Sequence, residues 1–147
     1  MKQMPTDKLS LSEAAAPLFI QRLAISVFMS VWIIDKFVNP AHASGVFAKF
    51  YGLPIDSSLA MTIGLAQAAI LAAFLLGYRR TISYLLILLM HGVSTLASWR
   101  IYAALFGTGG NLLFWAAIPV LAAMWVQFAL RRHDSISLDG RARASTA

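Results

Sequence analysis

LAMTIGLAQAAILAAFLLGY, which runs from Leu59 to Tyr78, contains no charged residue. Two further uncharged stretches follow it, Thr81–Trp99 and Ile101–Leu130. Because the hydrocarbon core of a bilayer is about 30 Å thick, a helix needs roughly 20 apolar residues to cross it. Hydrophobic residues make up 59% of the chain and charged residues 12%, values outside the usual range of soluble domains. The sequence therefore predicts an integral membrane protein.

Four membrane-spanning helices would use most of the 147 residues and leave no room for a second domain. The segment Leu18–Phe37, ahead of the opening stretch, is also apolar, although Arg22 interrupts it. We expect the third span over residues 82–102 and the fourth over residues 111–130, with Pro119 kinking the fourth. The predicted fold class is all-α, an integral membrane four-helix bundle with a short surface helix between spans 1 and 2.

The surface helix is expected within residues 38–57, which are too polar to cross a bilayer. Asn39 and Pro40 form a typical helix start, and Gly52 is a suitable stop. The spacing of its apolar and aromatic residues would place four of them on one side of a helix: Val46, Phe47, Phe50 and Tyr51. The pattern favours an amphipathic helix lying at the membrane surface, and an ordinary loop with aromatic anchors is the alternative.

The basic residues fix the expected orientation. The net charge of +6 could indicate nucleic-acid binding, but the Lys and Arg residues lie at the ends of the apolar runs, so we exclude that reading. Placing both termini and the second loop on one side gives that side nine Lys and Arg, against three on the other. The asymmetry predicts that both termini are cytoplasmic.

The absence of cysteine excludes disulfides and Cys-ligated iron–sulfur or zinc sites in this chain.

The expected organisation has three parts. Residues 1–16 form a cytoplasmic N-terminal tail, residues 17–130 the four-helix transmembrane domain, and residues 131–147 a disordered cytoplasmic tail. A rival interpretation makes the first span a signal peptide cleaved after Ala41-His42-Ala43. Against cleavage, Asp35 and Lys36 lie between the apolar region and the cut.

Arg22 lies one turn inside the expected edge of the first span. A charged side chain in hydrocarbon is costly, and long cationic side chains near helix ends reach towards the headgroups. We therefore expect the Arg22 stem to lie along the helix and its guanidinium to reach the membrane surface.

The third span carries a polar stripe, with spacings of three and four residues, formed by His91, Ser94, Thr95, Ser98 and Tyr102. Because polar groups in hydrocarbon are costly, we expect this face to point into the bundle, with Gln67 of the second span opposite His91. A candidate ligand or proton site is thus formed by His91, Gln67, Ser94, Thr95 and Ser98.

His91 has two interpretations. In one it is a proton relay, a haem ligand or a hydrogen-bond donor to a quinone. In the other it is a buried neutral histidine. Two His ligands for one haem within the bilayer would need two copies of the chain, since His42 and His133 lie outside the spans.

A second candidate site lies at the outer membrane face, where Asp35, Lys36, Arg100 and Asn111 fall at the ends of their spans. Such a charged and hydrogen-bonding cluster could hold an anionic or quinone-like headgroup. Alternatively, the four residues are interfacial anchors with a structural ion pair. No catalytic motif and no metal-binding motif appears in the sequence.

Short motifs in this chain resemble the DoxX family of small four-helix membrane proteins. The resemblance covers roughly residues 18–130 and rests on Arg22, Ile34–Pro40, Tyr51–Pro54 and Leu75–Gly77. It implies a bacterial inner-membrane protein in a redox-linked assembly, because the family takes its name from a subunit type associated with a thiosulfate:quinone oxidoreductase. Many relatives have Gly where this chain has Ile33 and Glu where it has Gln67. A neutral amide cannot exchange a proton at physiological pH, so proton coupling does not carry over.

Three functions are therefore weighed. The first is a non-catalytic membrane subunit of a quinone-linked redox assembly, with oxidoreductase subunits or further copies of the chain as partners. The second is an independent redox protein that binds quinone or haem through His91. The third is a small-molecule permease or exporter. Quinone is the one cofactor that the first two interpretations share.

Overall fold

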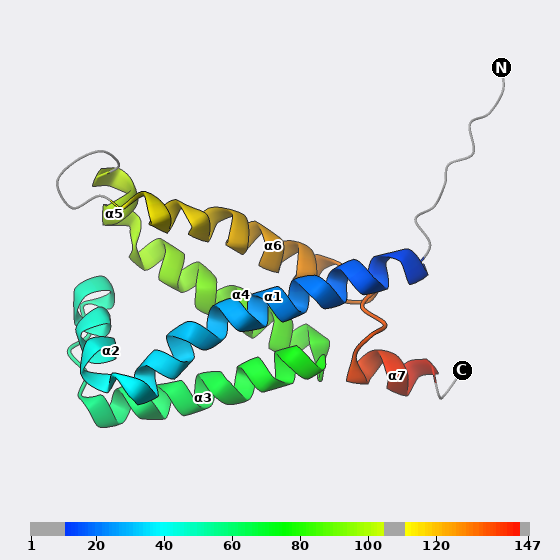
Figure 1. Ribbon diagram of the computed structural model, residues 1–147, viewed down its shortest axis with the longest axis horizontal. Coiled ribbons are helices and arrows are strands. Elements are labelled where there is room, and N and C mark those ends of the chain that lie inside the picture. The colour runs from blue at the N-terminus through cyan, green and yellow to red at the C-terminus, as the bar shows by residue number, and fades with distance from the viewer. Residues whose placement is uncertain (1–10, 105–110, 145–147) are drawn as a thin grey trace, which may run out of the picture.

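The computed structural model describes residues 11–104 and 111–144, all of them in helices, turns and short connections (Figure 1). The elements in chain order are α1 (Leu11–Val38), α2 (Pro40–Val46), η1 (Phe47–Tyr51), α3 (Ser57–Leu76), α4 (Arg80–Ala97), α5 (Trp99–Ala104), η2 (Leu112–Ala116), α6 (Ala117–Ala129) and α7 (Leu138–Ala144). Within these two ranges there is no β-strand, so the predicted all-α class is confirmed.

Four helical segments are long and apolar enough to cross a membrane, as the sequence predicted. They span Glu13–Val38, Ser57–Leu76, Arg80–Ala97 and Leu112–Ala129. Much of their apolar surface is exposed, with Leu96 at 74% and Val27 at 68%. An apolar exterior of this extent is typical of helices that face lipid tails.

The bundle packs α1 against α3 and α4 against α6, with further contacts between α3 and α4 and between α1 and α6. The side chains that form its core are Ile25, Met29, Phe74, Tyr84, Ile87 and Met124. Gly64 lets α3 approach α1 closely, since a Cβ there would lie 3.0 Å from Lys36 Cβ. Small residues at such crossings are the usual means of close helix packing in lipid.

The two ends of the bundle differ in what covers them (Figure 1). The α2 end carries α2, η1 and α5, together with the last turns of α1. The terminal end carries the start of α1, the α3–α4 turn at Gly77–Arg80 and the segment from Arg131 to α7.

The predicted helix after the first span is present, although it changes type part-way. Asn39 occupies the N-cap position, Pro40 the first turn, and Gly52 ends the segment with a left-handed φ of 66°. The second half, η1, is a π-helical turn. The predicted helix boundaries are therefore confirmed, and the membrane-surface location stays a prediction.

The third and fourth spans are less regular than expected. Helix α4 ends at Ala97, and α5 begins after Ser98 instead of continuing the same helix to Tyr102. The fourth span begins as the 3₁₀ turn η2 and becomes α-helical at Ala117. Pro119 thus lies in the first turn of α6, where its missing N–H costs no intrahelical bond, so the irregularity falls before the proline.

The prediction of a disordered tail is wrong for residues 131–144. This segment turns back along the terminal end of the bundle and ends in α7. Asp134 is fully buried and Ser137 is 3% exposed. The polar composition of the tail suggested solvation, but its polar side chains bind partners within the bundle.

Candidate functional site

A buried polar cluster at the terminal end joins Arg22 of α1, Tyr84 of α4, Gln127 of α6 and Asp134 of the C-terminal segment. We call it the Asp134 cluster. Oδ2 of Asp134 accepts hydrogen bonds from Arg22 Nη1 at 2.6 Å, Tyr84 Oη at 2.7 Å and Gln127 Nε2 at 3.1 Å. Arg22 Nη1 also donates to Tyr84 Oη at 2.9 Å. One carboxylate oxygen therefore connects three of the four bundle helices to the segment that follows α6.

The backbone around Asp134 is held by two arginines. The carbonyl oxygen of Asp134 accepts from Arg80 Nη1, and the carbonyl oxygen of Ile136 accepts from Arg22 Nη2. Charge-assisted hydrogen bonds of this kind are stronger than those between neutral groups. The position of the segment after α6 is thus fixed by cations from α1 and α4.

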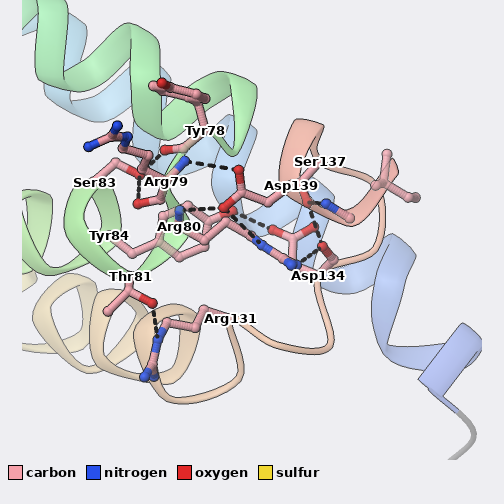
Figure 2. Close-up of polar contacts among 12 residues, drawn as sticks. Tyr78, Arg79, Arg80, Thr81, Ser83, Tyr84, Arg131, Asp134, Ser137 and Asp139 are labelled. Atoms are coloured by element: carbon pink, nitrogen blue, oxygen red, sulfur yellow. Dashed lines mark hydrogen bonds and ion pairs between the residues drawn. The ribbon is translucent and has the colours of Figure 1, made fainter. Parts of the chain in front are cut away.

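Asp139 at the start of α7 caps α4 (Figure 2). Its two carboxylate oxygens accept from the backbone N–H of Arg79 at 3.1 Å and of Arg80 at 2.9 Å. The first N–H groups of a helix lack intrahelical partners, and a carboxylate there also complements the helix dipole. Arg80 Nε lies 3.8 Å from Asp139 Oδ2, which adds an ion pair to the cap.

The expectation that Arg22 reaches the membrane surface is wrong. Its side chain is 2% exposed and pairs with Asp134 inside the protein. An arginine within an apolar helix can lower its desolvation cost by snorkelling or by pairing with an anion. Here the returning C-terminal segment supplies the anion.

The Asp134 cluster keeps unused hydrogen-bonding capacity. Arg22 Nε, Gln127 Oε1 and Asp134 Oδ1 are buried and find no partner among the residues that the structure describes. Buried polar atoms usually have a partner in the protein or in ordered water, so these three atoms leave hydrogen-bonding capacity in the cluster that the described side chains do not use.

His91 lies inside the bundle, as its spacing predicted, and is 7% exposed. Its Nε2 lies 3.1 Å from the carbonyl oxygen of Ala117 in α6, and its ring meets Phe28 edge to face at 5.4 Å between centroids. In the part of the chain that the structure describes, the predicted partner Gln67 makes no hydrogen bond to His91. The histidine therefore links α4 to α6 instead of α4 to α3.

The other members of the stripe have structural partners. Thr95 Oγ1 donates to the His91 carbonyl at 2.8 Å, and Ser98 Oγ donates to the Ser94 carbonyl at 2.9 Å. Ser94 Oγ pairs instead with Tyr51 Oη of η1 at 2.5 Å. Hydroxyl groups that bond one turn back need no ligand. The hydrogen bond between Ser94 and Tyr51, by contrast, reaches another element.

The four residues predicted as an outer-face site are not brought together as one cluster. Asp35 pairs with Nδ1 of His42 at 2.8 Å, and Lys36 donates to the Trp32 carbonyl at 2.9 Å. Arg100 lies over the Trp99 ring, and Asn111 caps η2 by accepting from the N–H of Leu113 at 3.0 Å. Within residues 11–104 and 111–144, no hydrogen bond or ion pair joins any two of Asp35, Lys36, Arg100 and Asn111.

A cavity of about 520 Å³ at the α2 end lies between η1 and the junction of α4 with α5. We call it the α2-end cavity. Its lining includes the cations Lys49 and Arg100 and the aromatic residues Phe50, Tyr51 and Trp99. Lys49 lies 5.5 Å from the Phe50 ring centre, and Arg100 lies 5.5 Å from that of Trp99. Of the predicted outer-face residues, Arg100 alone lines this cavity.

Aromatic contacts hold the elements around this cavity. Phe50 of η1 stacks on Phe114 of η2 at 5.9 Å, and Tyr102 of α5 meets Trp115 of η2 edge to face at 5.6 Å. Burial raises the pKa of the Tyr102 phenol. Over residues 11–104 and 111–144, no group of three His, Asp or Glu side chains could hold a metal ion.

The sequence reasoning missed Tyr84, Gln127, Asp134 and Asp139. One signal could have found the carboxylates. The chain has six acidic residues against 12 Lys and Arg, and an arginine inside an apolar span needs an anion nearby. Asp134 and Asp139 lie on the same predicted membrane side as Arg22, so they were candidates for that role. Nothing in the local pattern marks Tyr84 or Gln127.

Comparisons with protein-family models, curated proteins and solved structures found no match for this chain. The DoxX resemblance and the functions that it implies thus rest on the sequence motifs alone.

Proposed function

We propose that this chain is a DoxX-like, non-catalytic integral membrane subunit of a quinone-linked redox assembly. In this proposal the chain lies in the bacterial inner membrane with both termini in the cytoplasm. The α2-end cavity carries the proposal, because it combines two cations with aromatic walls next to the end of two apolar helices. A quinone headgroup is a flat ring with two carbonyl acceptors, which suits aromatic walls and N–H donors.

The environment of His91 supports an accessory role over a catalytic one. Its Nε2 already engages the Ala117 carbonyl, and its ring packs against Phe28. Ligation of a haem iron through Nε2 would break the hydrogen bond to the Ala117 carbonyl. The proposal therefore assigns His91 a structural role.

Purification in mild detergent tests the function. We expect bound quinone after solvent extraction, together with co-purifying subunits that contain flavin or iron. The double variant Lys49→Gln/Arg100→Gln should lose most of the quinone and still fold. The control Arg132→Gln, at the terminal end, should keep it. Equal quinone content in the wild-type protein, the double variant and the control would contradict the role of the α2-end cavity. Purification without any redox subunit would contradict the proposed assembly.

Reporter fusions test the orientation independently. Fusions at Gly45, at Arg79 and at the C-terminus should report outside, inside and inside, as the charge asymmetry predicts. A C-terminus that reports outside would contradict the proposed topology.

A further inference from the structure

A second pocket, of about 210 Å³, lies at the terminal end between α1, α3 and α7. We call it the terminal pocket. Its polar wall includes Arg22, Ser137 and Arg141, and its apolar wall includes Phe19, Leu75 and Leu76. It is distinct from the α2-end cavity, which lies at the opposite end of the bundle.

Arg22 gives this pocket a built-in cation. The side chain is only 2% exposed. Its Nε has no hydrogen-bond partner among residues 11–104 and 111–144. Its two terminal nitrogens are already committed to Tyr84, Asp134 and the Ile136 carbonyl. A buried guanidinium with a spare N–H donor favours an additional acceptor, and an anionic oxygen is the strongest kind.

A second cation, Arg141 of α7, lies in the wall of the terminal pocket. Among the described residues, Arg22 pairs with Asp134 and Arg80 with Asp139 at this end. Arg141, which lines the terminal pocket and is exposed, takes part in neither. The pocket therefore has a net positive wall.

The apolar wall indicates what kind of anion fits. Leu75 is 38% exposed and Leu76 54%, and both lie in the last turn of the apolar helix α3. A free ion in water would gain nothing from such a wall. An amphiphile would place its anionic head on the cations and its chain along the leucines.

We propose that the terminal pocket binds the phosphate group of an anionic phospholipid, with Arg22 and Arg141 as the contacting cations and Leu75 and Leu76 along the acyl chain. The phosphate would pair with Arg141, which takes part in neither ion pair of this end, and it would tie α7 to α1 and α3. Inorganic phosphate has the same anionic chemistry, so the experiment separates the lipid from the free ion.

Native mass spectrometry of the full chain in detergent provides the test. The probes are dioctanoyl phosphatidylglycerol, dioctanoyl phosphatidylcholine and inorganic phosphate. We expect phosphatidylglycerol to form one-to-one complexes at concentrations where the other two do not. Because Arg22 belongs to the Asp134 cluster, the variant is Arg141→Gln, which should weaken this binding about five-fold. The matched control Arg132→Gln, an exposed arginine outside the pocket, should leave it within two-fold.

A second variant tests the apolar wall. Leu76→Asn should weaken phosphatidylglycerol binding while thermal unfolding of the lipid-free protein stays unchanged. Equal binding of phosphatidylcholine would overturn the proposal, and so would equal weakening by Arg141→Gln and Arg132→Gln. Complexes with inorganic phosphate that block the lipid would assign the pocket to the free ion and also overturn it.

Discussion

The two ends of the bundle are built from different interactions. At the terminal end, cations from α1 and α4 bind carboxylates of the C-terminal segment, and both Arg22 and Asp134 are buried. At the α2 end, the cations Lys49 and Arg100 are exposed, lie over aromatic rings and border a cavity. The buried charge of Arg22 at the terminal end is paired inside the protein, whereas Lys49 and Arg100 at the α2 end stay exposed and available to a ligand.

This difference separates stability from binding. A buried ion pair contributes little net free energy when intact, but removing one partner leaves an unpaired charge in a low-dielectric site. An exposed cation over a ring is worth about 0.5–1 kcal/mol and can be removed without such a penalty. Substitutions within the Asp134 cluster should therefore change folding, whereas substitutions of Lys49 and Arg100 should change ligand binding at the α2-end cavity.

The largest effect is expected from Asp134→Asn. The substitution keeps the shape of the side chain but removes the charge that pairs with the buried Arg22. We expect the free energy of unfolding to fall by about 3–5 kcal/mol, the usual cost of breaking a buried pair. Equilibrium unfolding of the purified protein in mixed detergent micelles measures it.

A double-mutant cycle provides the control for this prediction. Arg22→Met removes the charge that Asp134→Asn leaves unpaired, so the double variant should be more stable than Asp134→Asn alone. If the two losses simply add, the pair is not coupled, and the terminal end would not differ from the α2 end in the way described.

The next largest effect is expected from Gly77→Ala in the α3–α4 turn. Gly77 has a φ of 65°, and a Cβ there would lie 2.3 Å from Ser137 Cβ and 2.8 Å from Arg22 Nη1. Left-handed strain and overpacking together should cost about 2–4 kcal/mol. Protease cleavage after residue 131 should also become faster in the variant, because α7 would be displaced.

Gly45→Ala is the matched control at the other end of the molecule. Gly45 lies in α2, and a Cβ there meets nothing within 4 Å. We expect this variant to be neutral or slightly stabilising, since alanine favours the helix over glycine. A loss of stability as large as that of Gly77→Ala would remove the distinction between the ends.

The spans were predictable because they depend on length and apolar composition alone. Leu59–Tyr78 corresponds closely to α3, and the Asn39–Pro40 start and the Gly52 stop were readable from backbone preferences of single residues. Such signals are local, so they survive without knowledge of the tertiary structure.

The Asp134 cluster was not predictable in the same way, because Arg22 and Asp134 are 112 residues apart in the chain. Local composition placed the C-terminal segment in solvent, whereas in the structure it is ordered by contacts with α1, α4 and α6. The same limit applies to His91. Its inward orientation followed from spacing, but its partner, the Ala117 carbonyl, is a backbone group that no side-chain pattern can indicate.

A smaller effect is expected from His91→Asn, which tests the link between α4 and α6. The substitution removes one hydrogen bond to the Ala117 carbonyl and an edge contact with Phe28. Interhelical hydrogen bonds in membranes average about 0.6 kcal/mol, so unfolding should become easier by about 1 kcal/mol or less. Quinone content and co-purifying subunits should be unchanged. Their loss from a variant that still folds would instead give His91 a direct functional role.

The smallest effect on stability is expected from Arg100→Gln. Arg100 is exposed, and the contact it loses is the one with the Trp99 ring, so the free energy of unfolding should fall by about 0.5 kcal/mol. Retention of quinone should nevertheless decrease, because the cavity loses one of its two cations. Measuring thermal unfolding and quinone content on the same preparation separates the two quantities. A drop in stability comparable to that of Asp134→Asn, with quinone retained, would mean that the α2 end also uses its charges for folding, and the contrast between the two ends would not hold.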